Sequence, residues 1–324
     1  MHTQIRWAYG YNQWKFSWQD FARVDDNLRA LKVTAACGFR AIELFGGTGP
    51  WFPLGRPESI ALNFGSAAKF KLQLEDCGIG AISSTFYDPT QLSFEELHFG
   101  LSPTKRADHA AILATARIHA LLLAELGGSC LVVRPFSSYA AEGPLDGARI
   151  ESAADCWNAV GKMTQALGLH TVLHLDALSA LRTRTELDQL LKLTDPGCVN
   201  LAVDTAELTI AGHDVVALYR HYHSRVRHFH FKDALAVDTL GEYKLPNAER
   251  AMILAGGKRK IERWFCEMGT LAGLVNFPAL LGAMKELGYA GWVVVESDKG
   301  PQPAASSMML NSWYFQRVLS PLLA

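Results

Sequence analysis

The chain has 324 residues, long for one ordinary domain but within the range of a single eight-stranded α/β barrel. Lys and Arg number 31 and Asp and Glu 32, and this near-neutral balance argues against a generally basic surface for nucleic acid or an anionic membrane. The six cysteines form no CxxC pair, and neither a secretory signal nor a bilayer-spanning apolar run is evident. A reduced, soluble, cytoplasmic protein is expected.

The first half of the chain alternates short apolar runs with helical segments. The predicted strands cover 5–10, 39–46, 79–87 and 129–136, and the predicted helices cover 27–36, 66–77, 102–128 and 146–167. The segment 102–128 is the clearest helix. Ser102 is placed to cap it, Pro103 stands at its first position, and Gly127 follows its last turn.

The second half repeats the same alternation four more times. Strands are predicted over 170–177, 199–205, 226–233 and 291–298, and helices over 183–193, 215–222, 276–289 and 305–319. Unbroken strand–helix alternation predicts a (β/α)8 TIM barrel, with residues 1–324 forming one domain. The long connections fall at about 45–63, 86–102 and 233–275, and the last has the length of a lid or binding loop.

Polar side chains gather where the last four predicted strands end. They are His174 and Asp176, Asp204, His228 and His230, and Glu296. In a parallel barrel these strand ends converge on one catalytic rim. Mixed nitrogen and oxygen donors suit manganese, cobalt, zinc or iron(II) better than calcium. The pattern therefore predicts a divalent-metal site.

Three motifs carry a resemblance to a known family. LAVDTAELTIAGHD at 201–214, RVRHFHFKD at 225–233 and the segment 267–298 resemble motifs of the sugar phosphate isomerase/epimerase superfamily, the xylose isomerase-like barrels. By position, the resemblance implies Asp204, His230 and Glu296 as metal ligands. It places His174 where most members have a Glu. Manganese is the expected ion, with cobalt, magnesium, zinc or iron as alternatives.

Two departures from the family pattern bear on the reaction. The family's Asp-Thr-x-His is here Asp-Thr-Ala-Glu, so Glu207 replaces a substrate-holding His. Only Glu296 remains of the two glutamates that serve the epimerases, because a metal-bound His174 is a poor proton acceptor. The resemblance therefore implies a lyase, in which Glu296 abstracts an α-proton and Asp176, Glu207 or Lys232 assists β-elimination.

Other residues are expected to hold the substrate. Aromatic side chains crowd the predicted loops, and Trp14 and Trp51 are predicted to contact a sugar, although loop packing or a subunit interface also explains them. Arg134, at the end of the fourth strand, and His228 are the other predicted substrate contacts.

The resemblance implies a small keto-sugar or keto-cyclitol substrate, as for the inosose dehydratase-like members. Alternatives are a ketose isomerase or epimerase, and the catalytic subunit of a C-glycoside deglycosidase, which works with a small β-rich partner. More remote are a barrel that has lost catalysis and an endonuclease IV-like nuclease, which needs three zinc ions and a basic groove. A homo-oligomer is expected, with neither a membrane nor a nucleic acid as partner.

Overall fold

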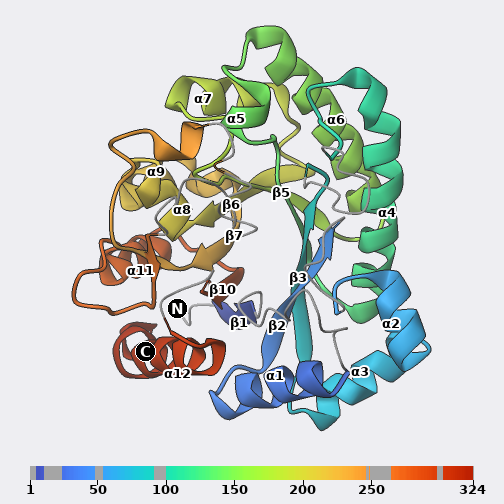
Figure 1. Ribbon diagram of the computed structural model, residues 1–324, viewed down its shortest axis with the longest axis vertical. Coiled ribbons are helices and arrows are strands. Elements are labelled where there is room, and N and C mark those ends of the chain that lie inside the picture. Colours follow the sequence, from blue (N-terminus) through green and yellow to red (C-terminus); the bar gives the residue numbers. More distant parts are fainter. Residues whose placement is uncertain are drawn as a thin grey trace.

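The computed structural model describes residues 5–10, 24–47, 54–90, 100–245, 248, 264–297 and 302–323. Eight parallel strands close into a barrel in the order β1-β10-β7-β6-β5-β4-β3-β2, with helices around it (Figure 1). The strands are β1 (Arg6–Gly10), β2 (Ala41–Gly47), β3 (Ala81–Asp88), β4 (Cys130–Val133), β5 (His170–His174), β6 (Val199–Asp204), β7 (Val226–Phe231) and β10 (Trp292–Glu296). The predicted (β/α)8 barrel is confirmed.

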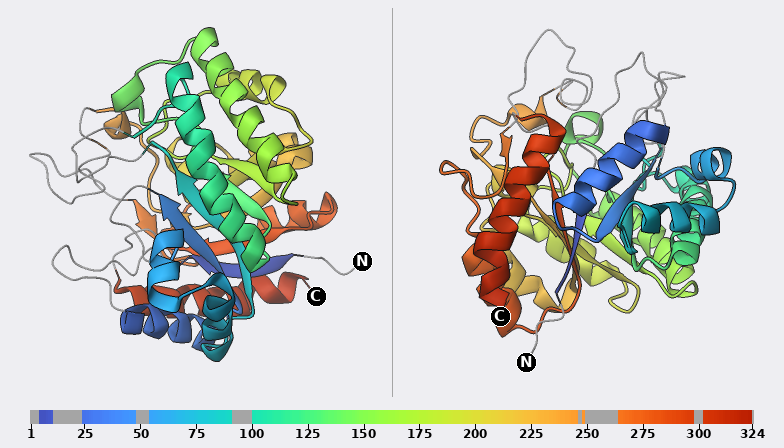
Figure 2. Two further views of the ribbon diagram at one scale, coloured as in Figure 1. Left: turned by 90° about the vertical axis from the view of Figure 1, so that its right-hand side faces the viewer. Right: turned by 90° about the horizontal axis from the view of Figure 1, so that it is seen from below.

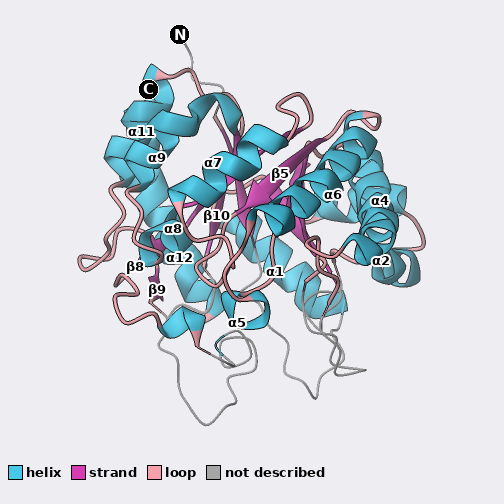
Figure 3. Ribbon diagram, turned by 90° about the horizontal axis from the view of Figure 1, so that it is seen from above, coloured by secondary structure: helices cyan, strands magenta, loops and turns pink. Residues whose placement is uncertain are grey.

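Helices enclose the strands on the outside (Figure 3). They are α1 (Val24–Ala36), α2 (Pro57–Phe64), α3 (Ala67–Asp76), α4 (His109–Leu126), α5 (Tyr139–Glu142), α6 (Gly147–Gln165), α7 (Arg184–Leu193), α8 (Thr205–Ile210), α9 (Val215–Tyr222), α11 (Phe277–Glu286) and α12 (Ala304–Tyr314). Local sequence fixes several starts. Thr183 and Glu186 form a capping box on α7, and the side chains of Asp146, Asp214 and Asn276 cap α6, α9 and α11.

The helix that looked clearest in the sequence begins later than predicted. A 3₁₀ turn, Arg106–Asp108, precedes α4, which starts at His109. Ser102 does not cap it, because its hydroxyl donates to Glu142 at 2.7 Å and its backbone N–H donates to Asp108 at 2.9 Å. The predicted end is confirmed: Gly127 takes the left-handed conformation, with φ of 79°.

The segment Arg106–Leu126 is also long and apolar enough, by length and composition, to cross a membrane. In the fold it lies beside α6 on the barrel wall (Figure 2). Its buried side chains follow helical spacing and face the core: Ile112, Ala116, Ala120, Leu123 and Leu126. This is the arrangement of a barrel helix.

Two predicted connections contain regular structure. All of the helix α2 except its last residue falls in 45–63, and the connection 233–275 supplies a short antiparallel ribbon, β8 (Asp233–Ala234) with β9 (Phe265–Cys266). This ribbon packs beside α8. It extends the polypeptide directly beyond the end of β7, where predicted site residues lie.

The barrel strands divide their side chains between two environments. Outward residues such as Leu131, Leu173, Val203, Phe229 and Val293 belong to the main hydrophobic cluster that packs against the helices. Inward residues form smaller apolar layers, including Val132, Val172 and Ala202. Above these layers the interior turns polar, and the predicted site residues lie there.

Candidate active site

The structure brings together side chains from the ends of four neighbouring strands. His174, Asp204, His230 and Glu296 are all buried, at 5%, 0%, 1% and 2% exposure. His174 Nε2 lies 3.2 Å from Asp204 Oδ2. His230 Nδ1 lies 3.4 Å from Glu296 Oε1 and 3.8 Å from Asp204 Oδ2. We call these four residues the rim cluster.

The donor atoms of the rim cluster fit a divalent ion. One ligand atom each from His174, Asp204 and His230 lies within 4.8 Å of the others. The Nδ1 atom of His230, which faces Asp204 and Glu296, is buried without a hydrogen-bond partner, whereas His174 faces Asp204 with its Nε2. Buried polar atoms left unpaired are unusual and point to a missing ligand. Two imidazoles and two carboxylates form a donor set suited to manganese, iron, cobalt or zinc.

Lys232 lies between the two carboxylates of the rim cluster. Its Nζ is 3.1 Å from Asp204 Oδ2 and 2.8 Å from Glu296 Oε1, and it rests over the ring of Phe265. Burial raises the pKa of Glu296, but Lys232 and His230 outweigh it and hold that pKa well below its usual range. Glu296 is therefore ionised and able to accept a proton or bind an ion.

Glu207 lies next to the rim cluster in the first turn of α8. Its Oε2 accepts the backbone N–H of Ala177 at 2.8 Å, and its Oε1 is 3.7 Å from Lys232 Nζ. Burial raises the pKa of Glu207 to about 8, against the opposing effect of Lys232. A carboxyl group with such a pKa is largely protonated at neutral pH, so Glu207 can donate a proton.

Asp176 and Arg134 face each other above the end of β5. The Arg134 Nε donates to Asp176 Oδ2 at 2.7 Å, and its Nη1 donates to the hydroxyl of Thr90 at 3.2 Å and lies 3.5 Å from Asp88 Oδ2. Both carboxylates therefore share one buried guanidinium. Asp176 is turned toward β4, whereas His174 is turned toward Asp204.

We expect Asp176→Asn to keep its metal and lose most turnover. Because His174 and not Asp176 is the proposed ligand beside Asp204, the affinity for the metal ion should change by no more than about threefold. The neutral asparagine side chain should weaken the charge-assisted hydrogen bond to Arg134, which is worth roughly 1.5–3 kcal/mol. Metal content by elemental analysis and a rate with a keto-sugar check this. Asp195→Asn, on the exposed turn before β6, is the control. Loss of metal from Asp176→Asn would make Asp176 the ligand.

His228, a predicted substrate contact, lies beneath the rim cluster. It lies one layer below His230 in β7 and is fully buried, and its Nε2 is 3.1 Å from Glu43 Oε2. Its role in substrate binding stays a prediction.

Glu43, in β2, is a site residue that the sequence reasoning missed. Its carboxylate accepts the hydroxyl of Ser84 at 2.6 Å and lies 3.0 Å from His230 Nε2. Burial raises the pKa of Glu43, but His230 and His228 lower it to about 2. One signal was available: a lone carboxylate in the otherwise apolar run FRAIELF.

The aromatic residues have divided roles. The ring of Phe86 meets that of His174 edge to face, with centroids 5.2 Å apart, and forms an apolar wall of the site. Trp7 packs against Phe231 and Phe315, and Tyr9 is buried beside Phe39, so these two belong to the barrel wall and not to the rim. The predicted substrate contacts Trp14 and Trp51 lie outside the described residues.

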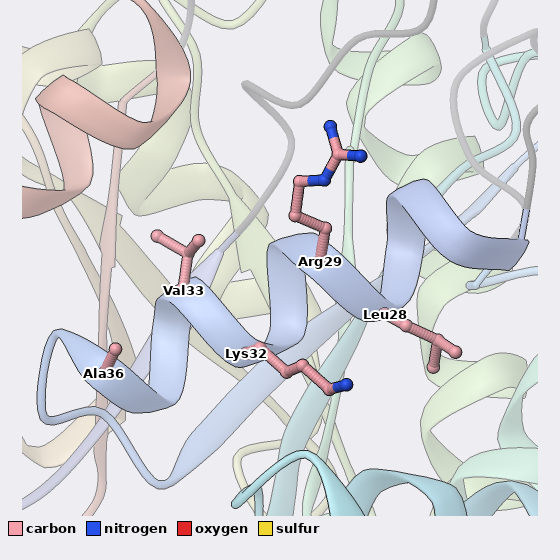
Figure 4. A pocket seen from close by; sticks show the side chains of 5 residues that line it. All are labelled: Leu28, Arg29, Lys32, Val33 and Ala36. Atoms are coloured by element: carbon pink, nitrogen blue, oxygen red, sulfur yellow. The ribbon is translucent and has the colours of Figure 1, made fainter.

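A surface hollow lies apart from this site, on the outer face of α1. It is lined by Leu28, Arg29, Lys32, Val33 and Ala36, which all come from one helix (Figure 4). None of the rim-cluster residues reaches it. The convergent polar groups typical of a substrate pocket lie at the rim cluster instead.

Sequence and structure comparisons place the chain among known proteins. Inosose dehydratase from Lacticaseibacillus casei is 31% identical over 145 residues, which cover 45% of this chain and 46% of that protein. The chain thus matches about half the length of this relative. A solved L-ribulose 3-epimerase has a TM-score of 0.70 at 15% identity, covering 99% of this chain and 96% of that one. A probable 3-DHS dehydratase from Bacillus anthracis has a TM-score of 0.71 at 12% identity, covering 97% and 99%.

These two solved structures support the fold, since their sequence identities are too low to carry an activity. A family model gives the broader assignment. The model described as "Xylose isomerase-like TIM barrel" matches residues 31–313, which include every member of the rim cluster. The chain belongs to the xylose isomerase-like TIM barrel family.

Proposed function

We propose that this chain is a divalent-metal-dependent lyase that acts on a keto-sugar or keto-cyclitol. The observation that supports this most directly is the rim cluster, where two buried imidazoles lie beside two buried carboxylates and His230 Nδ1 faces both of them without a hydrogen bond. The resemblance to inosose dehydratase over part of the chain favours a dehydration. Manganese is the proposed ion, held by His174, Asp204, His230 and Glu296.

A divalent ion in this site supplies Lewis-acid stabilisation of negative charge on a substrate oxygen. Glu296 accepts the proton from the carbon next to the ketone, since its buried carboxylate is ionised. The electrons of the broken C–H bond form an enediolate. They then form a carbon–carbon double bond as the C–O bond to the β-hydroxyl breaks, and a proton from Glu207 or Lys232 lets that hydroxyl leave as water.

The surroundings favour an uncharged polyol over an anionic substrate. The Arg134 guanidinium, which could hold a substrate carboxylate or phosphate, already contacts Asp88 and Asp176. The Lys232 ammonium likewise contacts Asp204 and Glu296. An added anion would compete with buried, hydrogen-bonded carboxylates for these cations. Hydroxyl groups can instead join the existing hydrogen bonds.

The test is incubation of metal-loaded protein in deuterated water with an inosose, a keto-glycoside and a panel of ketoses, followed by NMR. Loss of water from an inosose or keto-sugar is expected to outpace epimerisation. The reason is that the second carboxylate of an epimerase is replaced by His174. Deuterium at C3 of interconverting ketose epimers, without elimination from any substrate, would contradict the lyase and favour an epimerase. Release of an aromatic group from a keto-glycoside would favour a deglycosidase.

Three further proposals go with this activity. The substrate is a small molecule, the protein works in the cytoplasm, and the chain forms a homo-oligomer. Size-exclusion chromatography with light scattering tests the last of these, and elemental analysis of the purified protein distinguishes manganese from cobalt, magnesium, zinc and iron.

A further inference from the structure

A second polar group lies beneath the rim cluster, inside the barrel. It consists of Glu43 and Ser84, on β2 and β3, and His228 and His230, on β7. We call it the inner network. Glu43, Ser84 and His228 are 0% exposed and His230 is 1% exposed. Only His230 also belongs to the rim cluster, so the two groups meet at its imidazole ring.

The contacts of the inner network fix which nitrogen of each imidazole carries a proton. Glu43 Oε2 accepts the hydroxyl of Ser84, and a carboxylate oxygen is a hydrogen-bond acceptor. The Nε2 atoms of His228 and His230 lie 3.1 Å and 3.2 Å from the same oxygen, so each acts as an N–H donor. The remaining nitrogen of His230, Nδ1, then faces Asp204 and Glu296.

Irregularities in the barrel aim these side chains inward. The pairing of β2 with β3 shifts by one residue, so that Glu43 stands opposite Ser84 and Ser83 is skipped. The pairing of β6 with β7 also shifts, and brings Asp204 opposite His230. Such bulges commonly re-aim side chains beside functional sites. The first shift lies at residues of the inner network, and the second lies at residues of the rim cluster.

We propose that Glu43 is the positioning residue for the metal site: it orients His230 from behind and keeps Nδ1 as the atom presented to the ion. This inference rests on the proposed metal-dependent function. A carboxylate behind a ligand histidine fixes its tautomer and ring orientation and makes it a better ligand. Ser84 and His228 hold Glu43 in turn, which assigns His228 a purpose without substrate contact.

Glu43→Gln tests the proposal with little change of shape. The hydrogen bonds of Ser84, His228 and His230 all go to Oε2, at 2.6, 3.1 and 3.2 Å, so an amide oxygen in the place of Oε2 keeps them. The negative charge behind His230 is lost, however, and the NH₂ group stands where Oε1 was, 3.0 Å from the Nε2–H of His230. The weaker acceptor and the added donor loosen the hold on the ring, so Nδ1 becomes a poorer ligand.

We expect the affinity for Zn²⁺, measured by competition with a chromogenic chelator, to fall about 10- to 100-fold in Glu43→Gln. Glu142→Gln is the matched control, since the Glu142 carboxylate also accepts hydrogen bonds from Ser102, Thr104 and Arg149 but lies outside both groups. Its affinity should stay within about twofold. Ser84→Ala, a smaller change, should lower the affinity in the same direction and extends the test if Glu43→Gln does not fold.

NMR of ¹⁵N-histidine-labelled protein gives a readout independent of activity. Two protected downfield imidazole N–H signals, from His228 and His230, are expected in native protein and in Glu142→Gln. In Glu43→Gln they should move or disappear. Native affinity together with unchanged signals in Glu43→Gln would overturn the proposal. Failure of the native chain to bind Zn²⁺ or Mn²⁺ would contradict the proposed function instead, and the N–H signals of the metal-free protein would still test the role of Glu43.

Discussion

Replacing Asp204 with alanine is expected to remove the metal ion and with it the activity. Asp204 Oδ2 lies within 3.2 Å of His174 and 3.8 Å of His230, so its loss takes the central oxygen donor from the rim cluster. Lewis-acid stabilisation is worth several kcal/mol and each 1.4 kcal/mol is tenfold in rate, so turnover should fall about a thousandfold or more. Elemental analysis and steady-state rates measure the two losses.

Asp204 also caps α8, because its Oδ1 accepts the backbone N–H of Glu207 at 2.9 Å. Asp204→Ala should therefore destabilise the protein by about 1 kcal/mol, whereas Asp204→Asn should keep the cap and still bind the ion poorly. Asp214→Ala removes a similar cap, from α9, far from the rim cluster. It should cost a similar stability and no metal. An Asp204→Ala protein with full metal content would show that the ion binds elsewhere.

The barrel was predictable because its signals are local. Hydrophobic spacing within each segment indicates the barrel strands and the longer helices, and capping residues such as Asp146 and Thr183 mark helix starts. The start of α4 was wrong for a tertiary reason. Ser102 has a capping sequence, but its hydroxyl bonds Glu142, which is 40 positions away. Short helices such as α8 were missed because so few residues carry little periodicity.

The rim cluster was predictable for a geometric reason: strand ends in a parallel barrel meet at one rim. Glu43 was not, because it contacts His228 and His230 across 185 and 187 positions and the register shifts that aim it inward leave no mark in a single sequence. The same limit applies to the depth of His228 in the barrel. Strict alternation places both histidines of β7 on one face, but it does not tell which lies at the rim and which lies beneath it.

The second prediction concerns Glu296, the proposed base that removes the α-proton of the substrate. Its buried carboxylate lies at the end of β10, with Lys232 at 2.8 Å from Oε1. Beside it, Gly10 ends β1, and a Cβ there would come within 3.3 Å of the Glu296 Cβ. A side chain at Gly10 would therefore crowd this carboxylate.

Glu296→Gln should therefore abolish proton abstraction more severely than metal binding. A positioned general base contributes about 10²- to 10⁴-fold, so exchange of the substrate α-proton with deuterated water should fall by that factor, while an amide oxygen can still bind an ion weakly. Measurements at saturating Mn²⁺ separate the two effects. Glu267→Gln, which alters another buried carboxylate, hydrogen-bonded to Ser307, is the matched control. If Glu296→Gln still exchanges the α-proton at the native rate, the base must be a different carboxylate. Asp176 and Glu207 are then the candidates, and Glu207, with its pKa raised to about 8, would be an effective base once ionised.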